Sequence, residues 1–331
     1  MEFFHSVNVD WLGKKWYFLA FSLIFSVAGV ISMSYHWVHI GSPVPLGVDF
    51  SGGTQLQVQF RQPPDLTRIR QAMDEAGLKN ASVVPFSQSS TLGHVSGNEV
   101  LISLPEANDA AGVDQGRTEI ENALRSHYTS NFDERSVQSV GPTVGNQLKK
   151  QAALATLYSL LGMLVYLWFR FQLIYGVAAV VACFHDTLIT VGAFSLASSF
   201  GFNGLELSLT VIAAILTLIG YSMNDTIVVF DRIRENLRLT RREPLPVLVN
   251  RSINQTLSRT VLTSGLTFLT VLSLFVFGGQ VLRGFSFALV VGILIGTYSS
   301  IAVASPMLVA WQEWRASKGK TAVLPAARRA R

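Results

Sequence analysis

The stretch LIYGVAAVVACFHDTLITVGAFSLASSF, residues 173–200, contains one aspartate, Asp186, and no other residue that is charged at neutral pH when His185 is neutral. About 20 consecutive apolar residues in a helix are enough to cross the hydrocarbon core of a bilayer. Five further runs of this kind cover residues 16–34, 152–169, 205–230, 260–277 and 285–311. The sequence therefore predicts a polytopic α-helical membrane protein with six transmembrane helices.

The composition supports a lipid-facing surface. Charged residues make up 14% of the chain and hydrophobic residues 49%, whereas soluble domains contain about 25% charged residues. The net charge of +5 does not indicate a nucleic-acid partner, because residues 35–148 hold twelve acidic and only seven basic side chains. The positive charge lies instead beside the predicted spans, where it suits contact with membrane lipid.

Basic residues gather on one side of the predicted spans. Residues 231–259 carry seven arginines, residues 312–331 carry six basic side chains, and Lys14 and Lys15 precede the first span. Because such residues favour the cytoplasmic side, we predict a cytoplasmic N-terminus (1–15), a cytoplasmic loop (231–259) and a cytoplasmic tail (312–331).

The opposite side carries few basic residues. Between the later spans, residues 201–204 hold no basic side chain and residues 278–284 hold only Arg283. Lys149 and Lys150 also lie on this side and weaken the charge asymmetry without reversing it. The large inserted segment is thus expected on the side of the membrane opposite to the two termini.

The first apolar run has two interpretations. Basic residues before an apolar run are typical of a cleaved signal peptide. However, residues 31–35 offer no small-x-small cleavage site, and cleavage would leave the inserted segment untethered. We therefore predict an uncleaved anchor at residues 16–34.

Residues 35–150 are expected to form a small α+β domain. Leu56, Val58 and Phe60 alternate with polar residues, which is typical of a half-buried strand. Asp65 is placed to cap a following helix, and Gly77 to end it. The predicted elements are strand 54–60, helix 65–77, strands 81–86 and 100–104 joined by the loop 87–98, helix 109–128 and strand 135–140. Their order, βαββαβ, predicts a ferredoxin-like fold.

A glycine-rich string, GVDFSGGT (residues 47–54), precedes the first strand. Gly52 and Gly53 suit positive φ angles or a close approach of two backbones. A phosphate site is a poor alternative, because no Lys-Ser/Thr pair follows the glycines. We interpret the string, with Asp49, as a structural turn between membrane and domain.

The fourth predicted span contains a carboxylate far from its outer end. Asn224 and Asp225 lie about twenty residues into the run, and Asp231 follows at its cytoplasmic edge. Ionisable groups inside spans are costly, so they are functional candidates. Because desolvation favours the protonated form of a carboxyl group, Asp225 is suited to taking up and releasing a proton.

Two other polar features interrupt the spans. His185 and Asp186 lie near the middle of the third span; a proton relay and a structural contact between helices are both open. Arg259 begins the fifth span and is either an anchor at the interface or a counter-ion for Asp225. Cys183 is expected to be a small buried residue. No metal-binding cluster or cofactor motif is predicted.

The motifs resemble those of the SecD/SecF family of bacterial protein-export membrane proteins. The resemblance rests on GVDFSGGT, on VGPTVG (140–145), on FHD (184–186), on GYSMNDTIVVFDRIREN (220–236) and on NRSINQTLSRT (250–260). Phe50 and Asp231 resemble the SecF branch of the family more than the SecD branch. The resemblance implies a location in the bacterial inner membrane, with the inserted domain in the periplasm. The resemblance implies that Asp225 and Arg259 are the proton-transfer pair, and that Gly141 and Gly145 belong to a structural motif.

The resemblance also implies partners and an energy source. Proteins of this family belong to the resistance–nodulation–division superfamily and use the proton motive force in late steps of Sec-dependent export across the inner membrane. The implied partners are SecD, which is required, the SecYEG channel, YajC and the unfolded preprotein. Since superfamily transporters contain two halves of six spans each, this chain supplies one half and needs a second.

Three alternatives to a proton-driven transport subunit are less favoured by the sequence. Intramembrane aspartyl proteolysis by Asp186 and Asp225 is disfavoured, because the Gly-x-Gly-Asp pattern of such enzymes is absent and Asp225 follows Ser-Met-Asn. An exporter of small molecules or lipids would need a larger inserted domain. A passive translocon scaffold would be indicated if substitution of Asp225 left export unchanged. We therefore expect a transport subunit, not an enzyme.

Overall fold

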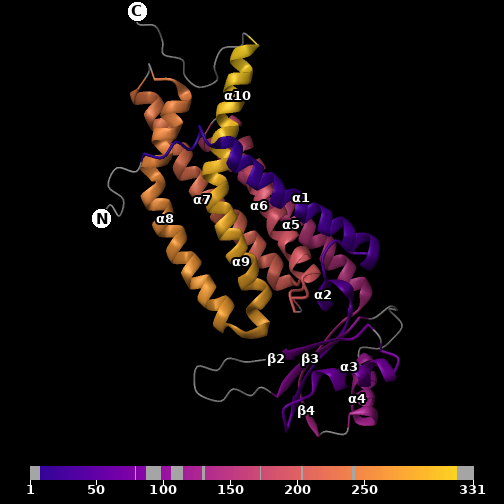
Figure 1. Cartoon of the computed structure of the whole chain (residues 1–331). Helices are drawn as coiled ribbons and strands as arrows, with labels where there is room; N and C mark the ends of the chain where they lie inside the picture. Colours follow the sequence, from indigo (N-terminus) through magenta and orange to yellow (C-terminus); the bar gives the residue numbers. More distant parts are fainter. Residues whose placement is uncertain are drawn as a thin grey trace, which may run out of the picture.

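The computed structural model describes residues 8–78, 80–86, 98–105, 115–128, 131–171, 173–202, 204–240 and 243–318. It consists of a long helix bundle with a small sheet domain at one end (Figure 1). The long helices of the bundle are α1 (Lys15–Ile40), α5 (Pro142–Arg170), α6 (Leu173–Ser199), α7 (Leu209–Leu239), α8 (Leu245–Phe277) and the continuous run of α9 (Gly279–Ser299), η1 (Ser300–Ala304) and α10 (Ser305–Ser317). Within the described residues, six segments are long and apolar enough to cross a membrane, which confirms the predicted six.

The helix α5 extends beyond its apolar run. It begins at Pro142, whereas the predicted span begins at residue 152. Proline is well suited to the first turn of a helix because its missing N–H would have no helical partner there. Hydrophobicity therefore marks the part of the helix that suits lipid, and the polar first turns connect the bundle to the sheet domain.

The segment 231–259, predicted as a loop, is mostly helical. The helix α7 continues to Leu239 and α8 begins at Leu245, directly after Pro244. Arginine and leucine, which occur seven and five times in this segment, both favour helix. The two extensions are joined by Asn236, whose side-chain amide donates to Ser252 Oγ at 2.8 Å.

The described end of the N-terminal segment is bound to the extension of α8. The side-chain oxygen of Asn250 accepts from the backbone N–H of Trp11 at 2.8 Å. The side chain of Asn254 accepts from the indole N–H of Trp11 at 3.0 Å and donates to the carbonyl of Val9 at 2.9 Å. These contacts give the two asparagines of the NRSINQT string a structural role.

The last membrane segment is interrupted by a short π-helix, η1. Inside this turn the hydroxyl of Ser305 donates to the carbonyl of Ser300 at 2.9 Å. A π-helix places one extra residue in a turn and is common near functional sites. It changes which side chains of α9 and α10 share a face, an effect that apolar periodicity does not predict.

The sheet domain contains the four strands and two helices expected from the sequence. They are β1 (Gly53–Phe60), α3 (Leu66–Glu75), β2 (Ser82–Phe86), β3 (Glu99–Leu104), α4 (Gln115–His127) and β4 (Phe132–Val140). The sheet order is β2-β3-β1-β4 and all pairs are antiparallel. This is the predicted ferredoxin-like fold. The predicted loop residues 87–97 and helix start 109–114 lie outside the described residues.

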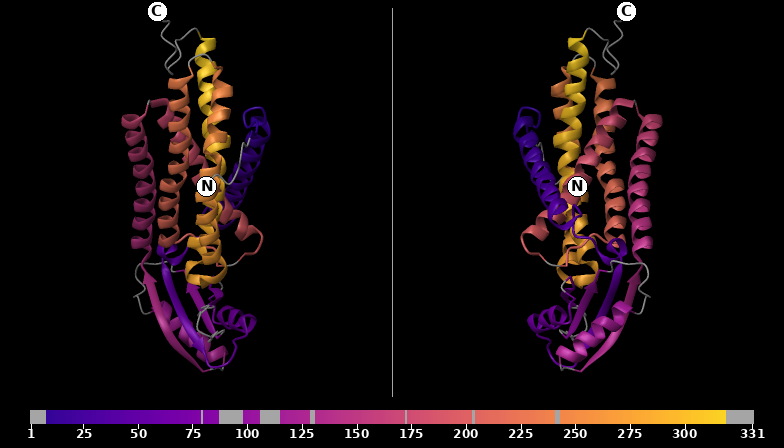
Figure 2. Two further views of the ribbon diagram at one scale, coloured as in Figure 1. Left: turned by 90° about the vertical axis from the view of Figure 1, so that its left-hand side faces the viewer. Right: turned by 90° about the vertical axis from the view of Figure 1, so that its right-hand side faces the viewer.

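One face of the sheet is covered by α3 and α4 (Figure 2). Leu56 and Val58 of β1 are buried in the core beneath these helices, while Gln55 and Gln57 lie on the opposite face and line a cleft at the end of the bundle. As predicted, Asp65 caps α3: its carboxylate accepts from the backbone N–H of Thr67 at 2.9 Å.

The glycine string forms the joint between bundle and sheet domain. It contains a short helix, α2 (Val48–Ser51), followed by Gly52 with φ 76° and Gly53 with φ 126°. A Cβ at Gly145 of α5 would lie 2.9 Å from the carbonyl oxygen of Phe50, and one at Gly52 would lie 2.9 Å from Pro142 Cα. Such approaches exclude larger residues, so the two glycine motifs pack on each other.

Asp49 connects this joint to α7. Its carboxylate accepts from the backbone N–H of Leu209, at the start of α7, at 3.0 Å, and from the side-chain amide of Gln138 of β4 at 2.9 Å. Leu46 also forms an isolated parallel β-bridge with Leu207, just before α7. Gly141 has open space around it, so its place in the motif has no steric cause.

Candidate functional site

Asp225 lies on α7 with its side chain turned into the bundle. It is only 4% exposed, and the hydroxyl of Ser264 on α8 donates to its Oδ2 at 2.8 Å. This is its sole side-chain hydrogen bond to another described residue. A carboxylate can accept about four hydrogen bonds, so most of its acceptor capacity is unused by the described protein groups.

Arg259 lies on the same helix as Ser264, five residues earlier. Its side chain is exposed, and it forms no ion pair with Asp225, although it lies within electrostatic range of that carboxylate. The structure therefore brings the two predicted partners onto neighbouring helices without direct contact.

An exposed polar row runs beside Asp225. On α7, Gly220, Asn224 and Asp231 are exposed. Neither Asn224 nor Asp231 hydrogen-bonds another described residue, so neither joins the contacts of Asp225. On α8, Arg259 is followed on its exposed side by Thr263 and by further threonines, Thr267 and Thr270.

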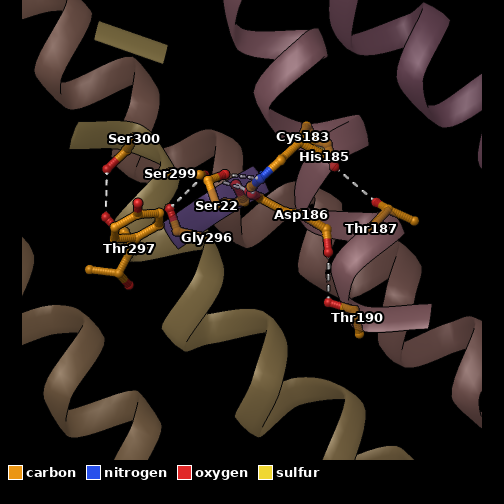
Figure 3. Close-up of polar contacts among 12 residues, drawn as sticks. Ser22, Cys183, His185, Asp186, Thr187, Thr190, Gly296, Thr297, Ser299 and Ser300 are labelled. Atoms are coloured by element: carbon orange, nitrogen blue, oxygen red, sulfur yellow. Dashed lines mark hydrogen bonds and ion pairs between the residues drawn. The ribbon is translucent and has the colours of Figure 1, made fainter. Parts of the chain in front are cut away.

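Asp186 is the centre of a separate cluster inside the bundle (Figure 3). The carboxylate is fully buried, at 0% exposure. Its Oδ2 accepts from the hydroxyl of Ser222 on α7 at 2.6 Å and from that of Ser299 on α9 at 2.7 Å. Its Oδ1 accepts from the Nδ1 of His185 at 3.0 Å.

His185 extends this cluster to a fourth helix. Its Nε2 forms a hydrogen bond with the hydroxyl of Ser22 on α1. Helices α6, α7 and α9 therefore meet at one carboxylate, and α1 is linked to it through His185. The sequence prediction identified His185 and Asp186 but missed Ser22, Ser222 and Ser299.

The contact between α1 and α6 is lined by small and polar residues. Gly29 and Gly192 meet so closely that a Cβ at Gly192 would lie 2.8 Å from Gly29 Cα. Further along, the hydroxyl of Ser195 lies 2.8 Å from Ser32 Oγ and 2.9 Å from the Nδ1 of His36. Small residues allow such close packing of helices in a membrane.

Both carboxylates are linked to α7: Asp225 lies on it, and Asp186 accepts a hydrogen bond from its Ser222. Ser222, which binds Asp186, lies three residues before Asp225 on α7. Asp186 and Asp225 bind different serines and do not hydrogen-bond each other. No group of three or more potential metal ligands occurs in the described part of the chain. Cys183 is buried and free, as expected.

Comparisons with protein-family models identify two matches. The model described as "Protein export membrane protein SecD/SecF, C-terminal" matches residues 119–314, and the "SecD/SecF GG Motif" model matches residues 40–64. The second match contains the joint built by Gly52 and Gly53.

Curated relatives and solved structures agree with these matches. Protein translocase subunit SecF of Koribacter versatilis is 54% identical, with 98% of this chain and 96% of the relative covered. That of Vibrio alginolyticus is 40% identical, with coverage of 87% and 84%. The crystal structure of SecDF from Thermus thermophilus, a translocon-associated membrane protein, is similar to this chain with a TM-score of 0.76. The two are 37% identical, and the match covers 93% of this chain and 39% of that chain. This chain thus spans about two fifths of the solved SecDF chain.

Proposed function

The chain belongs to the SecD/SecF family as a SecF protein translocase subunit, and from this premise we propose that it uses the proton motive force to drive late steps of Sec-dependent protein export. A translocase subunit of this kind is a multi-pass membrane transporter component, not a catalytic enzyme. The proposed proton-transfer group is Asp225.

The observation that carries this proposal is the contrast between a buried carboxylate and the exposed polar row in front of it. Asp225 has one side-chain hydrogen bond to a described residue, from Ser264. Beside it, Asn224, Thr263 and Arg259 are exposed on helices that otherwise suit lipid. Polar groups facing lipid are costly, so this face is suited to a protein partner and a wet path.

The proposed partner at this face is SecD. The solved SecDF chain is more than twice as long as the part that this chain covers, which agrees with a two-half transporter whose ion site lies between the halves. We place SecYEG, YajC and the unfolded preprotein further out in the same assembly. The excess of arginine at the end of the bundle remote from the sheet domain favours cytoplasmic termini and a periplasmic sheet domain.

A protonation switch follows from the contacts of Asp225. The ionised carboxylate of Asp225 accepts from Ser264 of α8 and is proposed to attract Arg259, which lies on α8 as well. Protonation removes that attraction, so α7 and α8 are expected to change their relative positions. Asp186 is proposed to have a different role: its bonds to Ser222 and Ser299 tie α7 to the rest of the bundle.

The joint supplies a route from α7 to the sheet domain. Asp49 binds both the start of α7 and β4, and Leu46 bridges to Leu207. A displacement of α7 would therefore be transmitted to the sheet domain, which is proposed to contact the emerging chain.

The test is export by the full complex in proteoliposomes carrying Asp225→Asn. The variant is expected to assemble normally and to lose the proton-gradient-dependent part of export, while the ATP-driven part remains. Glu235→Gln is the matched control, because it removes an exposed carboxylate from the same helix and should retain full gradient dependence. Unchanged gradient-dependent export by Asp225→Asn would contradict the proposal and favour a passive scaffold.

A further inference from the structure

A groove lies between the first turns of α6 and the helix α10. The helix α10 lies at the end of the bundle remote from the sheet domain (Figure 1). Its volume is about 220 Å³ and its walls are almost entirely apolar. The residues that line it are Leu173, Ile174, Val177 and Ala178 of α6 and Met307, Trp311 and Arg315 of α10.

Several side chains that line this groove are exposed on the outer surface of the bundle. Leu173 is 51% exposed, Val177 39% and Trp311 43%. In a membrane-spanning helix such side chains contact lipid, so the groove opens toward acyl chains. It is formed by α6 and α10, whereas the exposed polar row that we assign to the SecD contact lies on α7 and α8.

The polar end of the groove carries one cation with unused hydrogen-bonding capacity. The Nε of Arg315 is buried and has no hydrogen-bond partner among the described residues, and its guanidinium forms no ion pair with any of them. A buried unpaired donor is costly, and more so when it is charged. Lys318, one turn further, stacks instead over the ring of Trp314 with its Nζ 4.1 Å from the centroid.

These two properties specify one kind of occupant. An apolar groove open to acyl chains requires a hydrocarbon tail, and the guanidinium at its end requires an anion that can accept from several N–H groups, for which phosphate is well suited. Trp311 lies beside Arg315, and tryptophan is enriched where hydrocarbon meets headgroups.

We propose that this groove binds an anionic phospholipid, with an acyl chain between α6 and α10 and the phosphate at Arg315. The site holds α10 against α6 just beyond the π-helix η1, so the lipid stabilises the last membrane segment. Lipid binding needs no proton transfer at Asp225 and is therefore independent of the proposed function. The proposed orientation decides only which leaflet of the membrane supplies the lipid.

The test uses the full SecD-containing complex in nanodiscs with two photoreactive phospholipids. Phosphatidylglycerol and phosphatidylethanolamine carry the same diazirine-labelled acyl chain, and adducts are mapped by peptide mass spectrometry. In the unmodified protein, adducts on residues 173–178 and 307–314 are expected to favour phosphatidylglycerol about fivefold, the effect of one basic residue near a lipid surface.

Two sets of variants separate the headgroup part of the site from the acyl-chain part. Arg315→Gln is expected to abolish the preference for phosphatidylglycerol, while Arg315→Lys keeps most of it and Lys318→Gln keeps all of it. Val177→Trp fills the groove and should reduce adducts of both lipids. Val165→Trp makes the same change at a 48% exposed position on α5 and should leave these adducts unchanged.

Three results would overturn the proposal. One is equal labelling by the two lipids in the unmodified protein. Another is a preference that survives in Arg315→Gln, and the third is labelling of the groove that Val177→Trp does not reduce. Gradient-dependent export by Asp225→Asn is measured separately, so failure of the lipid site and failure of the proton proposal are distinguishable.

Discussion

Asp186 and Asp225 are both buried carboxylates in apolar helices, but their surroundings differ. Asp186 accepts hydrogen bonds from Ser222, Ser299 and His185, which come from three helices. Asp225 accepts one side-chain hydrogen bond from a described residue, Ser264, and lies behind an exposed polar face. A carboxylate whose acceptor sites are filled from several helices holds a structure together, whereas one with few partners can change its protonation state with little loss of packing.

The largest expected effect is the loss of protein stability when Asp186, rather than Asp225, is replaced. Asp186→Ala leaves three hydrogen-bonding groups without their acceptor; at about 0.6 kcal/mol for each bond in a membrane protein, the loss is about 2 kcal/mol. Thermal unfolding of the purified complex should show this decrease in stability. Asp225→Ala is the control and should lose far less, and equal losses would mean that Asp186 is not the structural centre.

A smaller effect is expected from separating α1 and α6. A Cβ at Gly192 would lie 2.8 Å from Gly29 Cα, so Gly192→Ala forces the helices apart and strains the Ser22–His185 contact. Such overpacking costs about 1 kcal/mol, measurable as a lower unfolding temperature. Gly162→Ala on α5, where a Cβ meets open space, should be neutral. A neutral Gly192→Ala would show that the α1 arm of the cluster is dispensable.

The smallest expected effect concerns the single partner of Asp225. Ser264→Ala removes one hydrogen bond and should lower stability by only about 0.6 kcal/mol. Because that bond stabilises the ionised carboxylate, the pH dependence of gradient-driven export should nevertheless move to higher pH. Thr267→Ala, on the same helix, should leave the pH profile in place. An unchanged profile for Ser264→Ala would mean that Ser264 does not act on Asp225.

The sequence predicted the features that depend on hydrophobicity and local spacing. The six spans follow from apolar runs, and the βαββαβ order from alternation in strands such as 54–60 and from the cap at Asp65. The position of Asp225 deep within its span was also predicted, because a single charged residue is easily identified in an apolar run. The extensions of α5, α7 and α8 were not predicted as helix, because a polar helix lacks that signal.

The partners of the carboxylates could not be predicted. A serine or threonine in a helix usually donates to the carbonyl four residues earlier, as Thr217 and Thr297 do. Ser222 and Ser264 donate to carboxylates on other helices instead. Which choice a hydroxyl makes depends on how the helices are rotated, and here the π-helix η1 changes the faces of the last segment.

The central claim is that Asp225, and not Asp186, changes its protonation state during the cycle. Infrared difference spectroscopy of the reconstituted complex across a pH step detects the carbonyl band of a newly protonated carboxyl group. We predict such a band in the unmodified complex, its loss in Asp225→Asn and its retention in Asp186→Asn. A band that persists in Asp225→Asn and disappears in Asp186→Asn would contradict the account.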